Sequence, residues 1–182
     1  FRMAFEQLDN ESMRLLWWRM RGEPLTWRAE LGRLVYFTAF SPDGKWVAAG
    51  GQDRSLYLLN ADTRETRILR GHADQIFVLA FSKDGSRLAS GDWGGRIWVW
   101  DLNTGRPLRS SMRHKGAVSG LSFHPDGELL ASGSHDRTIK LWRLSDGQLI
   151  RELRGHTSTV QGVTFNRAGD RLASASGDQT LK

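Results

Sequence analysis

Short apolar runs alternate with polar turns along most of the chain. The run from Ile76 to Phe81 is apolar throughout, which predicts a strand covered on both faces. The Ser-Lys-Asp-Gly segment after it predicts a tight turn, because aspartate and glycine supply turn geometry. Further strands are predicted at Arg87 to Ser90, at Arg96 to Trp100 and near Pro107 to Met112. The last of these is more polar and contains a proline, as suits a strand at a sheet edge.

This four-strand pattern recurs along the chain with a fixed period. The phenylalanines that precede the turns follow one another at steps of 41, 42 and 42 residues: Phe40, Phe81, Phe123 and Phe165. Three histidines share the 42-residue step, and so do two tryptophans: His72, His114 and His156, and Trp100 and Trp142. Because several residue types keep one period, the chain is predicted to be an array of repeated structural units.

Paired residues at the ends of each unit indicate a family. Gly71-His72 and Gly155-His156 open two units, and Trp100-Asp101 closes one, a pattern that resembles the WD-repeat family of β-propellers. Some units depart from it: Arg113-His114, Trp142-Arg143, Leu31 and Leu59-Asn60. The resemblance covers about residues 22 to 182 and implies an all-β fold, a partial WD-repeat propeller of about four four-stranded blades. The expected units are 31–70, 71–112, 113–154 and a truncated 155–182.

The resemblance also implies a structural hydrogen-bond set of histidine, serine, aspartate and tryptophan in each blade. The set comprises His114, Ser132, Asp136 and Trp142 in the third unit, His156, Ser174 and Asp178 in the fourth, and His72, Ser90 and Trp100 in the second. Gly94 stands where the second unit should have its aspartate, and the first unit keeps only Asp53. Because buried polar groups persist where they satisfy one another, we predict that units one and two are the less rigid.

The N-terminal segment, residues 1–30, allows two interpretations. Gly22 to Leu25 repeats the pattern of Gly105 to Leu108, which predicts the outer strands of a preceding blade over residues 12–30. An apolar stripe between Phe5 and Met20 would also fit a helix. Three forms of ring closure are possible: these strands complete the last unit, two chains form an eight-bladed ring through open blade edges, or the chain is part of a longer array.

Composition and spacing bear on the possible chemistry. The chain has no cysteine, which excludes disulfides and thiolate metal sites. Its apolar runs are too short for a membrane helix. Because cysteine is absent and residues 1–10 lack a signal-peptide core, we expect an intracellular, cytoplasmic protein. Serine, histidine and aspartate recur in the later units, whereas a catalytic site occurs once, so we expect no enzyme. The histidines lie on different units, so neither a metal nor another cofactor is expected.

Two positions in each blade of WD-repeat proteins tend to face partners on the top face of the propeller. Carried over to this chain, these positions are Tyr36, Phe77, Ser119 and Gln161, and Gln52, Trp93, His135 and Gly177. Three of these residues are large aromatics at places where the fold does not need them, and aromatics dominate binding hot spots. We therefore predict a protein–protein interaction scaffold or sensor module of a larger assembly, which binds other proteins or peptides through this face.

Two other functions remain open from the sequence. The net charge is +6 and arises mostly from dispersed arginines, of which Arg54, Arg96 and Arg137 fall in turns between second and third strands. Such a surface predicts, as an alternative, nucleic-acid binding through backbone phosphates with steep salt dependence. WD-repeat arrays are also often joined to other domains, so the chain is alternatively the ligand-sensing end of a multidomain signalling NTPase or kinase.

Overall fold

The computed structural model describes Leu31 and residues 34–182. The chain divides into two compact units, Phe1–Gly32 and Arg33–Lys182, and the described fold belongs to the second. The strands predicted over residues 12–30, and the alternative helix, lie outside the described residues. Residues 34–182 contain strands and turns but no helix, so none is present there that could span a membrane.

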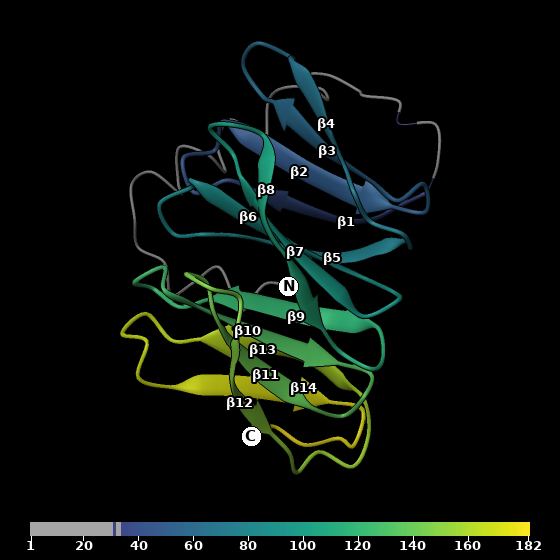
Figure 1. Ribbon diagram of the computed structural model, residues 1–182, viewed down its shortest axis with the longest axis vertical. Coiled ribbons are helices and arrows are strands. Elements are labelled where there is room, and N and C mark those ends of the chain that lie inside the picture. Colours follow the sequence, from purple (N-terminus) through teal and green to yellow (C-terminus); the bar gives the residue numbers. More distant parts are fainter. Residues whose placement is uncertain (1–30, 32–33) are drawn as a thin grey trace, which may run out of the picture. The chain divides into compact units, whose positions relative to one another are not determined.

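Within residues 34–182, fourteen strands form four antiparallel sheets that follow one another in chain order (Figure 1). Blade 1 comprises β1 (Val35–Phe40), β2 (Trp46–Gly51), β3 (Ser55–Asn60) and β4 (Thr66–Arg70); blade 2 comprises β5 (Ile76–Phe81), β6 (Arg87–Asp92), β7 (Arg96–Asp101) and β8 (Arg106–Arg113); blade 3 comprises β9 (Val118–Phe123), β10 (Leu129–Ser134), β11 (Ile139–Arg143) and β12 (Leu149–Leu153); blade 4 comprises β13 (Val160–Phe165) and β14 (Leu172–Ser176).

The strands of each blade pair in sequence order, as in a meander. In blade 4 an isolated bridge joins Ala175 to Leu181 beside the two strands. The all-β fold predicted from the sequence is confirmed. The strands predicted in the second unit are found as β5 to β8, and the predicted turn after Phe81 closes with a hydrogen bond from the Gly85 amide to the Ser82 carbonyl at 2.9 Å.

Neighbouring blades pack through their first and second strands, and a glycine on one blade receives a β-branched residue of the next. A Cβ atom at Gly91 would lie 2.6 Å from Val118, and one at Gly133 would lie 2.7 Å from Val160. Both distances are too short for any side chain to fit without a shift. The absence of a side chain at these repeated positions therefore lets β9 and β13 approach the preceding blade, and Val118 and Val160 are fully buried there.

Candidate interaction surface

Each inner strand begins with a β-bulge, and the bulge residue is one of the predicted partner-facing positions. In blade 2 the pairing of Ile76 with Asp92 is followed by the pairing of Val78 with Gly91, so Phe77 is the extra residue. The same irregularity leaves an extra residue in the other three blades, at Tyr36, Ser119 and Gln161. Because a bulge turns a side chain out of the regular alternation, these residues belong neither to the blade core nor to the strand ladder.

Four of the predicted residues bring their rings together into what we call the aromatic cluster: Tyr36, Phe77, Trp93 and His135. Phe77 lies at its centre, with ring centroids 6.3 Å from Tyr36, 5.3 Å from Trp93 and 6.3 Å from His135. Trp93 meets His135 edge to face at 5.6 Å. The cluster thus joins residues of blades 1, 2 and 3, and 51% of Trp93 and 42% of Tyr36 remain exposed to solvent.

The other predicted partner-facing residues have different surroundings. The Ser119 hydroxyl bonds the carbonyl of Val160 on the neighbouring blade, so this serine connects blades 3 and 4. The Gln161 side chain is exposed and donates to the Thr159 hydroxyl at 2.8 Å. Gln52 and Gly177 are exposed as well. The serine is thus engaged with the protein itself, whereas the glutamine and glycine positions stay open to solvent.

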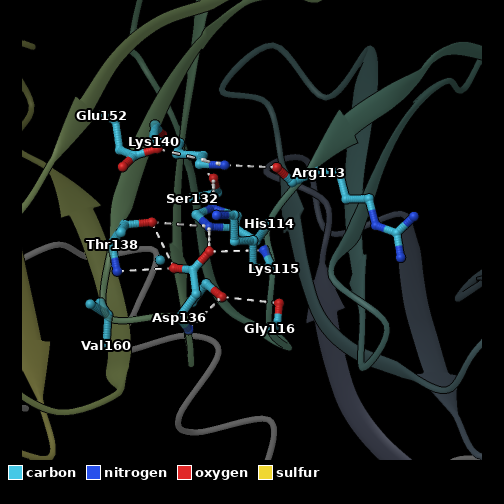
Figure 2. A network of polar contacts seen from close by, with 12 residues as sticks. Arg113, His114, Lys115, Gly116, Ser132, Asp136, Thr138, Lys140, Glu152 and Val160 are labelled. Atoms are coloured by element: carbon cyan, nitrogen blue, oxygen red, sulfur yellow. Dashed lines mark hydrogen bonds and ion pairs between the residues drawn. The ribbon is translucent and has the colours of Figure 1, made fainter.

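The predicted polar set of blade 3 forms a continuous chain of hydrogen bonds. The Trp142 indole nitrogen donates to the Ser132 hydroxyl at 2.7 Å, and that hydroxyl lies 2.7 Å from Nε2 of His114. On its other side, Nδ1 of His114 lies 2.9 Å from Asp136, which also accepts from Thr138 at 2.6 Å; Figure 2 shows this network from His114 outward. Since indole is only a donor, the serine proton is free to point to Nε2, which leaves the histidine neutral with its proton on Nδ1.

The pKa values of this pair agree with that arrangement. Burial lowers the pKa of His114 below its ordinary value, although the nearby Asp136 opposes the shift. Burial alone would raise the pKa of Asp136, but bonds from the Thr138 hydroxyl, the Lys115 amide and His114 hold it at about 2. At neutral pH the pair is therefore a neutral imidazole donating to a carboxylate.

Blade 2 contains a carboxylate that sequence reasoning missed. Asp92, not the residue at position 94, bonds Nδ1 of His72 at 2.7 Å, while Ser90 bonds Nε2 at 2.7 Å and accepts from Trp100 at 2.8 Å. Asp92 is fully buried and also accepts from the Arg96 amide at 2.8 Å. The expectation that the second blade lacks this group was wrong, because an aspartate two positions earlier reaches the histidine from the end of β6.

Blades 4 and 1 differ in how much of the set they hold. In blade 4, His156 lies 2.9 Å from Ser174 and 2.8 Å from Asp178, whose pKa is held well below its usual range, first by the Thr180 hydroxyl. In blade 1, Asp53 instead accepts from the Tyr57 hydroxyl at 2.5 Å and from the Ser55 amide at 3.0 Å. The aspartate of blade 1 therefore stabilises only its own turn and strand.

Serine, histidine and aspartate are hydrogen-bonded in the same order as in a hydrolytic triad, but their burial indicates a structural role. Ser90 and Ser132 are fully buried, and each hydroxyl already accepts a bond from a tryptophan. A buried, occupied hydroxyl offers no path to a substrate. Among the described residues, no three histidine, aspartate or glutamate side chains are grouped so that they could hold a metal ion.

Of the three arginines predicted in turns between second and third strands, Arg54 and Arg137 lie in such turns, but the prediction for Arg96 was wrong, because Arg96 is the first residue of β7. Arg54, Arg96 and Arg137 are all exposed. Arg54 and Arg137 adopt positive φ values of 65° and 69°, and the Arg54 guanidinium donates to the Ala73 carbonyl at 3.4 Å. Nucleic-acid binding through these side chains stays a prediction.

Comparison with known proteins identifies the repeats. A family model described as "WD domain, G-beta repeat" matches residues 26–60, 63–101, 105–143 and 147–182. The solved structure of U3-55K superimposes on the chain with a TM-score of 0.75 at 23% sequence identity, covering 85% of this chain and 52% of that one. At that identity the likeness shows the fold alone.

Similar curated proteins match over shorter stretches. Intraflagellar transport protein 122 homolog of Mus musculus is 36% identical over 76 residues, which is 42% of this chain and 6% of the mouse protein. ASTRA-associated protein 1 of Penicillium rubens is 49% identical over 51 residues, covering 28% and 12% of the two chains. The U5 small nuclear ribonucleoprotein 40 kDa protein of Dictyostelium discoideum is 29% identical over 87 residues, covering 47% and 24%. The chain thus spans a minor part of these relatives.

Proposed function

Since the chain belongs to the WD-repeat family, we propose that it is a protein-interaction module that binds other proteins or peptides through the aromatic cluster. The aromatic cluster lies on the face of the blades that contains the bulges and the loops between second and third strands. We call this face the top face. The names of its relatives include an intraflagellar transport protein, an ASTRA-associated protein and a ribonucleoprotein subunit, which supports a place in a larger assembly.

The observation that carries the proposal is a half-exposed cluster of rings at positions where the fold accepts polar residues. Ser119 and Gln161 occupy the same bulge position as Tyr36 and Phe77, so the bulge itself does not require an aromatic side chain. Exposed Trp93 next to partly buried Phe77 offers a large, rigid apolar surface with little side-chain entropy to lose on binding.

The loops that hold the rings are well anchored. Trp93 directly follows buried Asp92, and its amide donates to the Gln75 carbonyl at 2.9 Å. His135 directly precedes Asp136, and its amide donates to the Ala117 carbonyl at 2.9 Å. The structural hydrogen-bond sets of blades 2 and 3 therefore fix the backbone beneath the cluster. Such preorganisation lowers the cost of ordering a binding surface.

The test compares partner binding by three forms of the protein in cells that naturally produce it. The first is wild type, the second carries Tyr36→Ala and Trp93→Ala, and the third carries Leu149→Ala and Ile150→Ala. The third is a matched control, because Leu149 and Ile150 are 44% and 46% exposed on β12, away from the cluster. Affinity enrichment with quantitative mass spectrometry measures which proteins each form retains.

We expect specific partners to be retained by wild type and by the β12 control and lost with the cluster variant. Removing a hot-spot aromatic typically costs about 2 kcal/mol or more, equivalent to a loss of about thirtyfold in affinity. Circular dichroism should report the same fold for all three forms, since every altered side chain is exposed. Equal recovery of the same partners by all three forms would contradict the proposal.

A further inference from the structure

A recessed surface lies at the opposite end of the inner strands from the aromatic cluster. A cavity of about 280 Å³ is lined by the ends of β5, β9 and β13, where the repeated phenylalanines Phe81, Phe123 and Phe165 stand. Phe77 and Phe81 occupy the two ends of β5, about 13 Å apart at the usual rise of a strand. The cavity is therefore separate from the top face, and a ligand could bind there whether or not the aromatic cluster binds a partner.

Contacts between blades hold the cavity wall in place. The Phe165 amide of β13 donates to the Ser122 hydroxyl of β9 at 3.1 Å. The His124 ring meets Phe165 edge to face at 5.0 Å, and its Nε2 lies 3.0 Å from the Gly169 carbonyl. A Cβ atom at Gly169 would lie 2.3 Å from that nitrogen, so the glycine makes the close approach possible. Blades 3 and 4 thus present a shaped apolar surface.

Two cations at the cavity have no acidic partner among residues 34–182. Lys83 and Arg167 line it from the turns of blades 2 and 4, and both are exposed. Neither makes an ion pair within residues 34–182. Asp84, the neighbour of Lys83, accepts instead from the hydroxyls of its own turn, Ser82 at 2.5 Å and Ser86 at 2.6 Å.

Blade 4 departs from the turn pattern in a way that increases the positive charge. The position after Arg167 is Ala168, whereas the other three turns have aspartate there: Asp43, Asp84 and Asp126. The next acidic residue along the chain, Asp170, accepts from the side-chain amide nitrogen Nδ2 of Asn166 at 2.6 Å. The cavity therefore combines aromatic and aliphatic side chains, with Ser122 and Asn166 among them, and two positive charges that have no acidic partner in the described part of the chain, and no acidic residue of that part lines it.

We propose that this cavity binds an acidic peptide segment of a partner protein, with one large apolar side chain among the phenylalanine rings and carboxylates beside Lys83 and Arg167. The volume lies at the lower limit of the about 300–1,000 Å³ found in pockets for drug-sized ligands, which is enough room for one large apolar side chain of such a peptide. The unpaired cations select for negative charge because ion pairing at a rim costs little desolvation.

The probe is a capped pentapeptide with a central phenylalanine between two aspartates, titrated into the full 182-residue chain labelled with nitrogen-15. Two further peptides replace the aspartates by lysines, or the phenylalanine by alanine. The proposal predicts saturable amide shifts at Phe81, Phe123 and Phe165 with the acidic phenylalanine peptide alone. Absence of saturable shifts up to about 1 mM peptide would overturn it, and so would shifts confined to Phe77 and Trp93.

Paired charge reversals separate the site from the overall charge of the protein. Lys83→Glu with Arg167→Glu alters the cavity, and Lys115→Glu with Arg137→Glu alters exposed side chains on the top face by the same total charge. The cavity variant should bind the acidic peptide at least about tenfold more weakly, and the top-face variant should bind it within about twofold of wild type. If both variants bound the acidic peptide equally weakly, the loss of affinity would reflect the net charge of the protein, and the proposal would be overturned.

Discussion

Replacing Asp92 by serine should destabilise the protein by about 3–5 kcal/mol. The carboxylate is fully buried and accepts two hydrogen bonds, from His72 at 2.7 Å and from the Arg96 amide at 2.8 Å. A bond to a charged group contributes about 1.5–3 kcal/mol, and a buried donor that loses its partner carries its full desolvation cost. A domain of this size has a total stability of about 5–15 kcal/mol, so the change is large enough to measure by urea unfolding.

The double variant Asp92→Ser, Gly94→Asp tests the reason for that loss. It gives blade 2 the arrangement of Ser134 and Asp136 in blade 3, so about half of the lost stability should return. Gly94→Asp alone should destabilise, because the Cβ of the new aspartate would lie 3.4 Å from oxygens of both Asp92 and Asp74, which brings a third carboxylate next to these two. The reasoning is refuted if Asp92→Ser lies within about 0.5 kcal/mol of wild type, or if the second substitution recovers nothing.

Other perturbations test the packing, the acid response and the differences between blades. Gly71→Ala should cost about 1–3 kcal/mol, because its Cβ would lie 2.8 Å from the Trp98 ring. Gly162→Ala is the control in the same thermal melts, because its Cβ meets no atom within 4 Å, and equal losses of Tm would contradict the reasoning. Acid should reduce the free energy of unfolding in two steps. Below about pH 6.5 the histidine at position 114 takes up a proton more readily in the unfolded chain than in the folded protein, where burial lowers its pKa. From about pH 4 towards 2 the carboxyl group of Asp136 is likewise protonated in the unfolded chain but stays charged in the folded protein, and a flat urea-derived profile would be inconsistent with both steps. Because Asp92 completes the polar set of blade 2, the lower rigidity predicted from the sequence for units one and two is expected for blade 1 alone. Amide hydrogen exchange should therefore be slower in blades 2 and 3 than in blade 1, and protection of blade 1 equal to theirs would count against a stabilising role for the polar sets.

Strand positions could be predicted from the sequence because one period orders several residue types at once. Each repeat places an apolar strand before a turn with glycine, and the structure has β5 at the run predicted from Ile76 to Phe81. The period also aligns Tyr36 with Phe77, and both prove to be bulge residues. Repetition makes such positions predictable, because every unit packs against its neighbours in the same way.

The repeat period did not predict contacts that one unit makes differently from the others. Asp92 falls outside the aligned position of the aspartate, and only the fold shows that it reaches His72. The aligned serine at the bulge, Ser119, bonds the neighbouring blade through its hydroxyl, which residue type alone does not indicate. The cavity between the turns joins Lys83 to Arg167, two residues 84 positions apart whose shared surroundings depend on how blades 2, 3 and 4 meet. Contacts between blades therefore cannot be predicted from an alignment of the repeats alone.

Crosslinking from inside the aromatic cluster tests the proposed interaction surface most directly. A photoreactive phenylalanine derivative at position 93 replaces exposed Trp93, and the same derivative at position 150 replaces similarly exposed Ile150 on β12. After irradiation in cells, mass spectrometry identifies the proteins joined to each position. A top-face module predicts a defined set of crosslinked partners from position 93 and background alone from position 150. Partners captured at position 150 with none at position 93 would contradict the account.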